Sequence, residues 1–344
     1  MGSLTRHGLR QSSHERFTVA DTGAVGAVRR AVCGYASRLS DDASFAAVAA
    51  RVATELATNL LRHARPGGWM LVRPLPPDGV EMLAVDSGPG IRDVAAAVAG
   101  RAPSPNGLGC GLAAVCSASS VFDVYSRRDR GTVVLAVVQA GRSRSRPARP
   151  ARRWAGISIG IDEACGDGWA VVEEAGELTV VVVDGLGHGI HASIAADAAL
   201  GALADSPTGL DGYLAHANAA MRHTRGAALA VGRLSAGGEE LRCLSIGNIG
   251  GSLVHRGAQR SIVAVNGTVG LREVPPVSKI RSYAWAADGT LVMWTDGLPS
   301  HIDLAAEAEL LTHDPAVVAA ALHRDHTRER DDATVVVVRN QVVP

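Results

Sequence analysis

One aspartate stands where a strongly apolar segment of the chain ends in a glycine-rich turn. Residues 180–183 are all valine, Asp184 follows them, and residues 185–189 read Gly-Leu-Gly-His-Gly. A buried strand would deliver this carboxylate into a turn that ligands can approach closely, because glycine has no Cβ. We interpret this segment as one part of a site for a hard metal ion.

Three further aspartates occur in the same kind of context in the second half of the chain. Asp167 lies within Gly-Asp-Gly, Asp296 follows an apolar run and precedes Gly297, and Asp331 precedes the valines at 335–338. Carboxylate oxygens without the Cys or His spacing of a zinc site favour Mg²⁺ or Mn²⁺. Two such ions can activate a shared water and neutralise the oxygens of a phosphoryl group. The four aspartates therefore predict metal-assisted hydrolysis of a phosphate ester.

The order of the motifs in this half resembles that of the SpoIIE-type metal-dependent serine phosphatases, which are related to the type 2C protein phosphatases. The motifs are Gly-Asp at 166–167, Asp-Gly-Leu-Gly-His-Gly at 184–189, Gly-Asn-Ile at 247–249, Thr-Asp-Gly at 295–297 and Asp-Asp-Ala-Thr at 331–334.

This resemblance implies a fold and a set of metal ligands. The fold would be a two-sheet core flanked by helices. Asp184 would bridge two Mn²⁺ or Mg²⁺ ions, and Gly185 would offer its carbonyl to one of them. Asp167 would serve that same ion, directly or through water, while Asp296 and Asp331 would hold the other. The substrates would be phosphoserine or phosphothreonine.

Ordinary structural roles compete with this interpretation at several positions. A single Asp-Gly pair is a common turn signal, and we interpret Asp288-Gly289 as a hairpin turn only. His188 could contact phosphate, but its place in a turn before a helix favours a structural or capping role. Asp332 stands where the wider superfamily often has Asn.

The first half of the chain carries a separate set of three motifs. Glu55 and Asn59 lie four residues apart in a segment with helical apolar spacing, so both project from one helix face. A predicted strand at 82–85 ends in Asp-x-Gly-x-Gly, beginning at Asp86. Residues 106–112 then form a glycine-rich loop that opens a predicted helix. Glycine N–H groups beside a helix N-terminus favour phosphate oxygens.

In this order, the three motifs resemble the GHKL-type ATP-binding fold, and especially the anti-sigma and switch kinases typified by RsbW and RsbT. The resemblance implies that Asn59 holds a Mg²⁺ ion on the ATP phosphates, that Asp86 accepts the adenine amino group, and that Glu55 is the general base of a kinase. Glycines would shape the adenine pocket (Gly88 and Gly90) and the lid over the phosphates (Gly107, Gly109 and Gly111). The same pocket also serves proteins that only bind or hydrolyse ATP.

A basic, proline-containing stretch separates the two motif sets. We therefore predict an ATP-binding α/β sandwich at residues 14–140, a linker at 141–153 and a phosphatase domain at 154–341, in an α/β (α+β) chain. The residues before about Glu15 are expected to be a poorly ordered lead-in.

Composition excludes several classes of function. The 344 residues carry 34 basic and 34 acidic side chains, so no general affinity for nucleic acid or membranes is indicated. No run is long and apolar enough for a membrane span, and five cysteines without paired spacing fit a reducing cytoplasm.

Together the two resemblances imply a bifunctional enzyme, a phosphatase and protein serine/threonine kinase of a partner-switching or stressosome-like sigma-factor pathway. Its partner would be a STAS-domain anti-sigma antagonist or stressosome protein, with a sigma factor, a downstream phosphatase or a second copy as further candidates. Two alternatives stay open: a phosphatase whose N-terminal domain is only an ATP sensor or docking module, and a non-catalytic binder of a sigma factor or STAS protein.

Overall fold

The structure is a computed structural model, and it describes residues 13–64, 67–101, 111–141, 152–204, 209–328 and 330–340. The chain divides into two compact units, one beginning at His14 and the other at Arg152. Each unit is described by itself. Among the described residues, no helix is long and apolar enough to cross a membrane.

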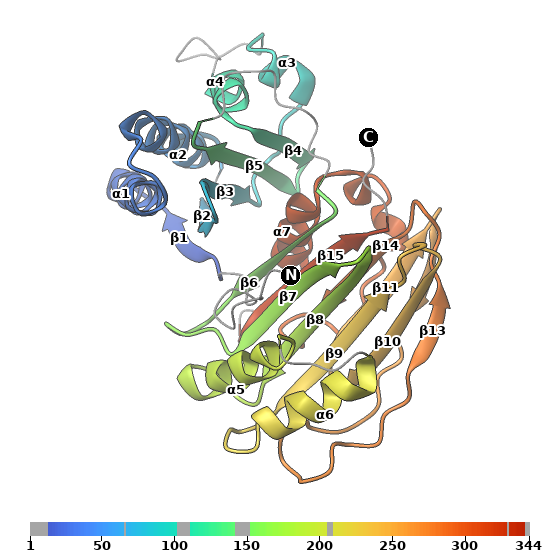
Figure 1. Cartoon of the computed structure of the whole chain (residues 1–344). Helices are drawn as coiled ribbons and strands as arrows, with labels where there is room; N and C mark the ends of the chain where they lie inside the picture. The colour runs from blue at the N-terminus through green and yellow to red at the C-terminus, as the bar shows by residue number, and fades with distance from the viewer. Residues whose placement is uncertain are drawn as a thin grey trace. The chain divides into compact units, whose positions relative to one another are not determined.

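The N-terminal unit is an antiparallel sheet with helices on one face (Figure 1). The strands follow the order β1-β2-β3-β5-β4. Their bounds are Glu15–Val19 (β1), Gly68–Leu75 (β2), Gly79–Asp86 (β3), Val121–Arg127 (β4) and Gly131–Gln139 (β5). The helices are Thr22–Leu39 (α1), Ala43–His63 (α2), Val94–Val98 (α3) and Gly111–Ala118 (α4).

Capping and amphipathic spacing explain the two long helices. Asp21 and Asp42 cap α1 and α2 by accepting hydrogen bonds from the first-turn N–H groups of Ala24 and Ser44, at 2.8 Å each. Helix α2 buries apolar residues along one stripe, which packs on alternate residues of β2 and β3 such as Met70 and Met82. That packing leaves the partly exposed side of α2, with Glu55 and Asn59, available for chemistry.

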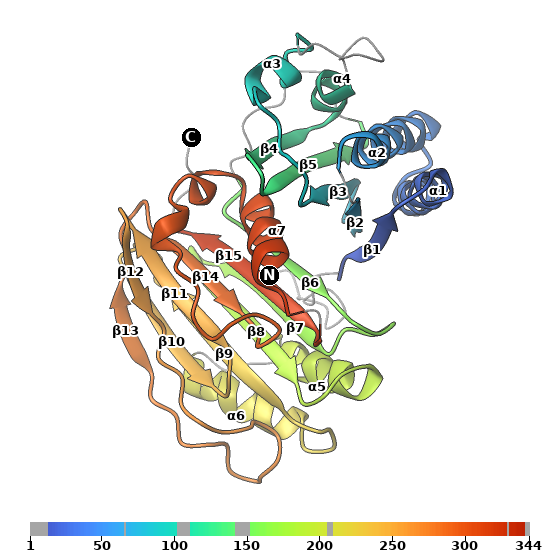
Figure 2. The same ribbon diagram turned by 180° about the vertical axis from the view of Figure 1, so that it is seen from behind.

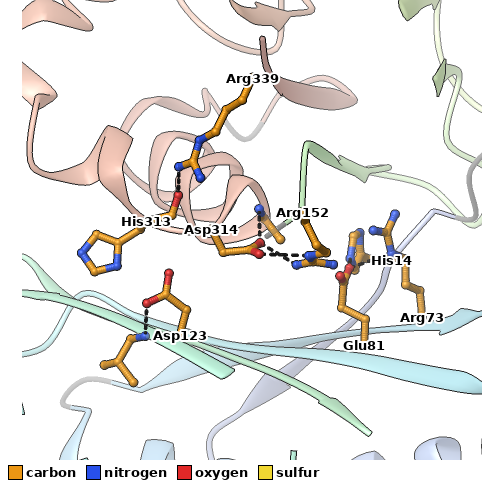
Figure 3. A network of polar contacts seen from close by, with 10 residues as sticks. His14, Arg73, Glu81, Asp123, Arg152, His313, Asp314 and Arg339 are labelled. Atoms are coloured by element: carbon orange, nitrogen blue, oxygen red, sulfur yellow. Dashed lines mark hydrogen bonds and ion pairs between the residues drawn. The ribbon is translucent and has the colours of Figure 1, made fainter. Parts of the chain in front are cut away.

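A buried polar group joins the start of the N-terminal unit to its sheet (Figure 3). Glu81 on β3 accepts a hydrogen bond from His14 Nε2 at 3.1 Å and pairs with Arg73 Nε at 2.7 Å. His14 is thus buried and bonded, and β1 begins at Glu15. Residues 1–12 of the expected lead-in lie outside the described residues.

The C-terminal unit contains two five-stranded antiparallel sheets that pack face to face (Figures 1 and 2). The first has the order β13-β10-β9-β8-β7, with bounds Arg281–Ala284, Glu240–Ile246, Ala227–Leu234, Glu177–Gly185 and Asp167–Glu174. The second has the order β12-β11-β14-β15-β6, with bounds Ala258–Ser261, Gly250–His255, Thr290–Trp294, Ala333–Arg339 and Trp154–Ile159.

Alternation along the strands divides the apolar residues between two layers of core. On β8, Val180 and Val182 face the second sheet, whereas Val181 and Val183 face helices α5 (Ile190–Gly201) and α6 (Leu210–Ala220). A strand buried on both faces reads as a continuous apolar run, which is the pattern that precedes Asp184.

Helix α7 (Pro315–His326) covers the outer face of the second sheet at β15 and β6 (Figure 2). Its N-cap, Asp314, accepts a hydrogen bond from Ala316 N and two from the Arg152 guanidinium, at 3.0 and 2.5 Å (Figure 3). Arg153 pairs with Glu173 at 2.7 Å. The last two residues of the predicted linker are therefore anchored on the C-terminal unit, and residues 142–151 lie outside the described part.

The mixed α/β class that we expected is confirmed, with helices flanking sheets in both units. The hairpin expected at Asp288-Gly289 is wrong, because this turn leads from β13 in one sheet to β14 in the other. Strands β1, β12 and β13 and the short helix α3 were not anticipated.

Candidate metal centre and nucleotide pocket

The two sheets of the C-terminal unit bring four aspartates together. Asp167 and Asp184 lie directly opposite each other on β7 and β8 of the first sheet. In the second sheet, Asp296 lies two residues beyond β14 and Asp331 two residues before β15. The negative charges of the other three aspartates act on Asp184 and raise its pKa. All four predicted carboxylates therefore belong to one cluster.

Hydroxyl groups between the sheets fix Asp167 in place. Thr295 Oγ1 donates to Asp167 Oδ2 at 2.6 Å and accepts from Thr334 N at 2.9 Å. The Thr334 hydroxyl is bonded in turn to that of Ser158 at 2.6 Å. Because these groups are buried, the chain of bonds holds one oxygen of Asp167 and joins β7 to β14 and β15.

Two glycines allow the turns that carry the aspartates to pack tightly. A Cβ on Gly185 would stand 2.2 Å from the carbonyl oxygen of Ala192 on α5, and one on Gly297 would stand 2.2 Å from that of Asp332. No side chain fits at such distances. The structure therefore explains why a glycine follows Asp184 and Asp296, and it places Gly185 at the end of β8 beside the cluster.

Burial and mutual repulsion raise the pKa values of the clustered carboxyls. The pKa of Asp184 rises to about 9, mainly by burial and then by the charges of Asp167, Asp296 and Asp331. Burial also raises the pKa of Asp167 to about 7, against the lowering effect of its bond from Thr295. The pKa of Asp296 is raised by burial and by Asp331. Concentrated carboxylates of this kind are stabilised by positive charge.

Asp184 and Asp296 also share a hydrogen bond, which raises the pKa of the former and lowers that of the latter. In this arrangement no three His, Cys, Asp or Glu side chains of the described ranges form a group that could hold a metal ion. The donor set nevertheless fits Mg²⁺ or Mn²⁺, since it consists of carboxylates whose proton such an ion would displace.

Two residues beside the cluster have functions that the sequence interpretation did not assign. Asn248 donates from Nδ2 to Asp296 Oδ2 at 2.5 Å, which fixes that carboxylate. Asp332 is buried and accepts from the N–H groups of Ile161 at 2.8 Å and Gly166 at 2.5 Å, so it holds the loop before Asp167. The only sequence signal for Asn248 was its place in the Gly-Asn-Ile motif.

Of the structural or capping role expected for His188, the structure excludes the cap on α5. The N-cap residue of this helix is Gly189, and no side chain caps it. His188 Nδ1 instead bonds Asp162 Oδ2 at 2.5 Å, at the exposed edge of the cluster, and this bond raises the pKa of the imidazole.

In the N-terminal unit, two of the three predicted motifs meet. A Cβ on Gly111, the first residue of α4, would lie 3.4 Å from Asn59 Oδ1 and 3.5 Å from Glu55 Oε2. The first residue of α4 therefore lies beside the face of α2 that carries Glu55 and Asn59. Gly107 and Gly109 lie outside the described residues.

The third motif forms the turn after β3. Asp86 Oδ1 accepts a hydrogen bond from Gly88 N at 2.7 Å. Gly90 has φ +76°, and a Cβ there would stand 2.6 Å from the carbonyl oxygen of Arg127, so only glycine fits. This geometry shows a tight turn, and the roles of Asp86, Gly88 and Gly90 toward adenine stay predictions.

The C-terminal unit also resembles known proteins. Residues 174–341 match the family described as stage II sporulation protein E (SpoIIE). No curated protein matches the chain. A chain solved in a study of the bacterial stressosome is 23% identical with a TM-score of 0.50, and the match covers 54% of this chain and 98% of that one.

Two further solved structures are similar at a lower level. RsbX in complex with magnesium is 20% identical with a TM-score of 0.47, covering 54% of this chain and 94% of that chain. The Mycobacterium tuberculosis serine/threonine phosphatase PstP/Ppp is 19% identical with a TM-score of 0.44, covering 54% and 97%. The family match covers residues 174–341, and the similar stressosome chain shares the fold of the C-terminal unit.

Proposed function

We propose that the C-terminal unit is a divalent-metal-dependent phosphatase that acts on phosphoserine or phosphothreonine of a partner protein. The observation that supports this most strongly is the cluster of Asp167, Asp184, Asp296 and Asp331, whose charges act on one another. Carboxylates lie this close together where a bound cation offsets the repulsion between their negative charges.

Asp184 would bridge two ions, with Asp167 and the Gly185 carbonyl completing the ligands of one, and Asp296 and Asp331 holding the other. When bound, the ions lower the pKa of a shared water and offset the charge of the phosphoryl oxygens. Thr295 and Asn248 act by orienting Asp167 and Asp296, each through one hydrogen bond. No protein nucleophile is needed for this chemistry.

Hydrolysis of p-nitrophenyl phosphate by the full chain tests the proposal. We expect turnover with Mn²⁺ or Mg²⁺ that EDTA removes and that the Asp184→Asn variant lacks. Wild-type protein that releases no nitrophenol with either ion would contradict it.

A second activity is proposed for the N-terminal unit, because α4 begins beside Asn59 and Glu55. This unit would bind ATP with a Mg²⁺ ion held by Asn59, and Glu55 would accept a proton from the hydroxyl that is phosphorylated. Phosphoryl transfer needs mainly positioning and charge compensation, so one base and one ion can suffice. An ATP sensor or docking module is the alternative.

Incubation with γ-labelled ATP and a STAS-domain protein separates these alternatives. A kinase transfers label to the STAS protein in a reaction that Glu55→Ala abolishes, whereas a sensor binds ATP without transfer. A phosphatase removes that label unless Asp184 is changed to Ala. A non-catalytic binder of a sigma factor or STAS protein would show neither reaction.

The physiological partner is proposed to be a STAS-domain anti-sigma antagonist or a stressosome protein, met in the cytoplasm. The SpoIIE-type domain supports this assignment, and the similar stressosome chain agrees with it. The two opposed activities would then set the phosphorylation state of one partner.

A further inference from the structure

Large apolar side chains are exposed, among the described residues, only in three segments of the C-terminal unit. Scattered single apolar residues need no explanation, but contiguous ones indicate an interaction surface. The exposed residues are Ile161, Leu186, Ile190, Ile194, Val263, Leu271, Val274 and Val277.

The first of these segments follows Asp184 directly. Leu186 is 40% exposed, and Ile190 and Ile194 on α5 are 61% and 47% exposed. The last two lie one helical turn apart on the same face, while Ala192 and Ala195 bury the opposite face against the sheet. The apolar side chains therefore continue outward from the carboxylate cluster along α5.

A second segment lies beside Leu186. Leu186 N donates to the carbonyl of Gly226 at 3.0 Å, and a Cβ on Gly226 would lie 3.3 Å from Leu271 Cδ2. The buried amide of Asn218 fixes this segment by accepting from Gly270 N at 2.8 Å and donating to the carbonyl of Arg272 at 2.9 Å. Leu271 is thus held outward by its backbone, and is 57% exposed.

The third segment is bonded to Asp332, the neighbour of the proposed ligand Asp331. Ile161 is 46% exposed and donates its N–H to Asp332, next to Asp331. The neighbouring Asp162 bonds His188, two residues beyond Leu186. We define Ile161, Leu186, Ile190, Ile194 and Leu271 as the apolar rim of the carboxylate cluster.

We propose that the apolar rim is the docking surface for a folded phosphoprotein, which rests on it with apolar residues that flank its phosphorylated serine or threonine. The inference rests on the proposed phosphatase function. Because Leu186 lies two residues beyond Asp184 and Ile161 N bonds Asp332, a molecule on the rim lies beside the cluster that its phosphate would enter.

The extent of the rim favours a folded partner over a short peptide. The rim is assembled from three separate chain segments, at Ile161, at residues 186–194 and at Leu271, and a partner that presents more than one stretch of its own chain matches such a surface. Apolar contacts around a phosphorylated residue would supply affinity that the phosphate alone does not.

The test compares three substrates with the full chain and Mn²⁺: a folded, serine-phosphorylated STAS-domain protein, a phosphopeptide cut from it, and p-nitrophenyl phosphate. The variant is Ile190→Gln/Leu271→Gln, which changes exposed residues outside the metal ligands. The control is Ala258→Gln on the edge strand β12. Ala258 pairs with His255, which is the last residue of β11 and therefore lies at the end of that strand away from Asn248.

We expect kcat/KM of the double variant to fall about tenfold for the folded protein, through KM, and to stay unchanged for the two small substrates. The control should match wild type throughout. An equal fall for all three substrates, or no fall for the folded protein, would overturn the docking surface. A variant that self-associates less in light scattering, with activity unchanged, would also overturn it, because the rim would then be the contact surface for a second copy of this chain. Wild-type protein inactive on p-nitrophenyl phosphate would instead refute the phosphatase function itself.

Discussion

Asp184 combines burial with three neighbouring carboxylates, and this combination determines the behaviour of the metal-free protein. The folded state keeps a proton on Asp184, with its pKa at about 9, whereas an unfolded aspartate has lost that proton well below neutral pH. Taking up this proton at neutral pH lowers the free energy of unfolding, and a bound cation would offset that loss.

The Asp184→Asn variant should therefore be more stable than wild type in EDTA near neutral pH. The amide is neutral in the folded and the unfolded state, so the variant folds without taking up a proton at this position. We expect its Tm to rise by about 3 °C, and phosphatase activity to fall by about 100-fold or more. Thermal melts with EDTA and with Mn²⁺ check this. Stabilisation of the variant by Mn²⁺ to the same extent as wild type would contradict the assignment of Asp184.

Stability should also depend on pH in a definite direction. The raised pKa values of Asp167 and Asp184 mean that the folded protein binds more protons than the unfolded chain above about pH 4. The free energy of unfolding in EDTA should consequently decrease as pH rises from about 4 to about 9, and saturating Mn²⁺ should reduce this decrease. Denaturant titrations across this range measure it, and increasing stability over the same interval would rule out the proposed cluster.

Asn248 offers a test of positioning, because it contacts Asp296 and is not itself a proposed ligand. Asn248→Ala should raise the Mn²⁺ concentration that gives half-maximal activity by about tenfold, with kcat at saturating metal largely retained. The matched change Asn266→Ala, at an exposed asparagine, is the control. An unaltered metal requirement would show that this bond does not position Asp296.

At the scale of elements, α7 connects the end of the linker to the cluster. Arg152 binds its N-cap Asp314, and beyond its last turn Arg328 N donates to the carbonyl of Gly297, next to Asp296, at 2.9 Å. Arg152→Ala should lower the free energy of unfolding of the C-terminal unit by about 1–3 kcal/mol, because a buried carboxylate loses its charged partner.

Denaturant unfolding followed by tryptophan fluorescence checks this prediction. The control is Arg153→Ala, which loses an ion pair with the more exposed Glu173 and should cost less. Equal losses in the two variants would mean that the Arg152–Asp314 pair has no special part in anchoring α7.

The sequence was sufficient for elements with strong apolar periodicity and insufficient for short edge strands with exposed residues. Strand β8 could be predicted from its valines because it is buried on both faces. Strands β12 and β13 are short, lie at sheet edges and have exposed residues, so their sequences carry little pattern. The Asp288-Gly289 turn was mistaken for a hairpin because a local signal cannot show that its flanking strands enter different sheets.

For the candidate site, the sequence predicted the aspartates but not the hydrogen bonds that position them. Each aspartate was visible from its glycine turn or its neighbouring strand, but the bonds from Thr295 and Asn248 join segments far apart in the chain. Such contacts depend on how the two sheets pack together. The spacing of residues within one segment does not predict that packing.

At the scale of the whole molecule, the proposal is that one chain joins an ATP-binding unit to a phosphatase. The Asp86→Asn variant should then lose most of its ATP affinity, by about 10–100-fold, because the adenine amino group loses its carboxylate acceptor. Fluorescent ATP binding measures this, and hydrolysis of p-nitrophenyl phosphate without nucleotide should be unchanged. Unaltered ATP affinity would contradict the adenine role of Asp86.

The central claim is that the four aspartates of the two sheets hold a pair of divalent ions. Anomalous diffraction at the manganese edge from crystals grown with Mn²⁺ tests it most directly. We expect two adjacent peaks with the Asp184 carboxylate between them, one toward Asp167 and one toward Asp296 and Asp331. A map without anomalous density between these side chains, at a Mn²⁺ concentration that saturates activity, would contradict it.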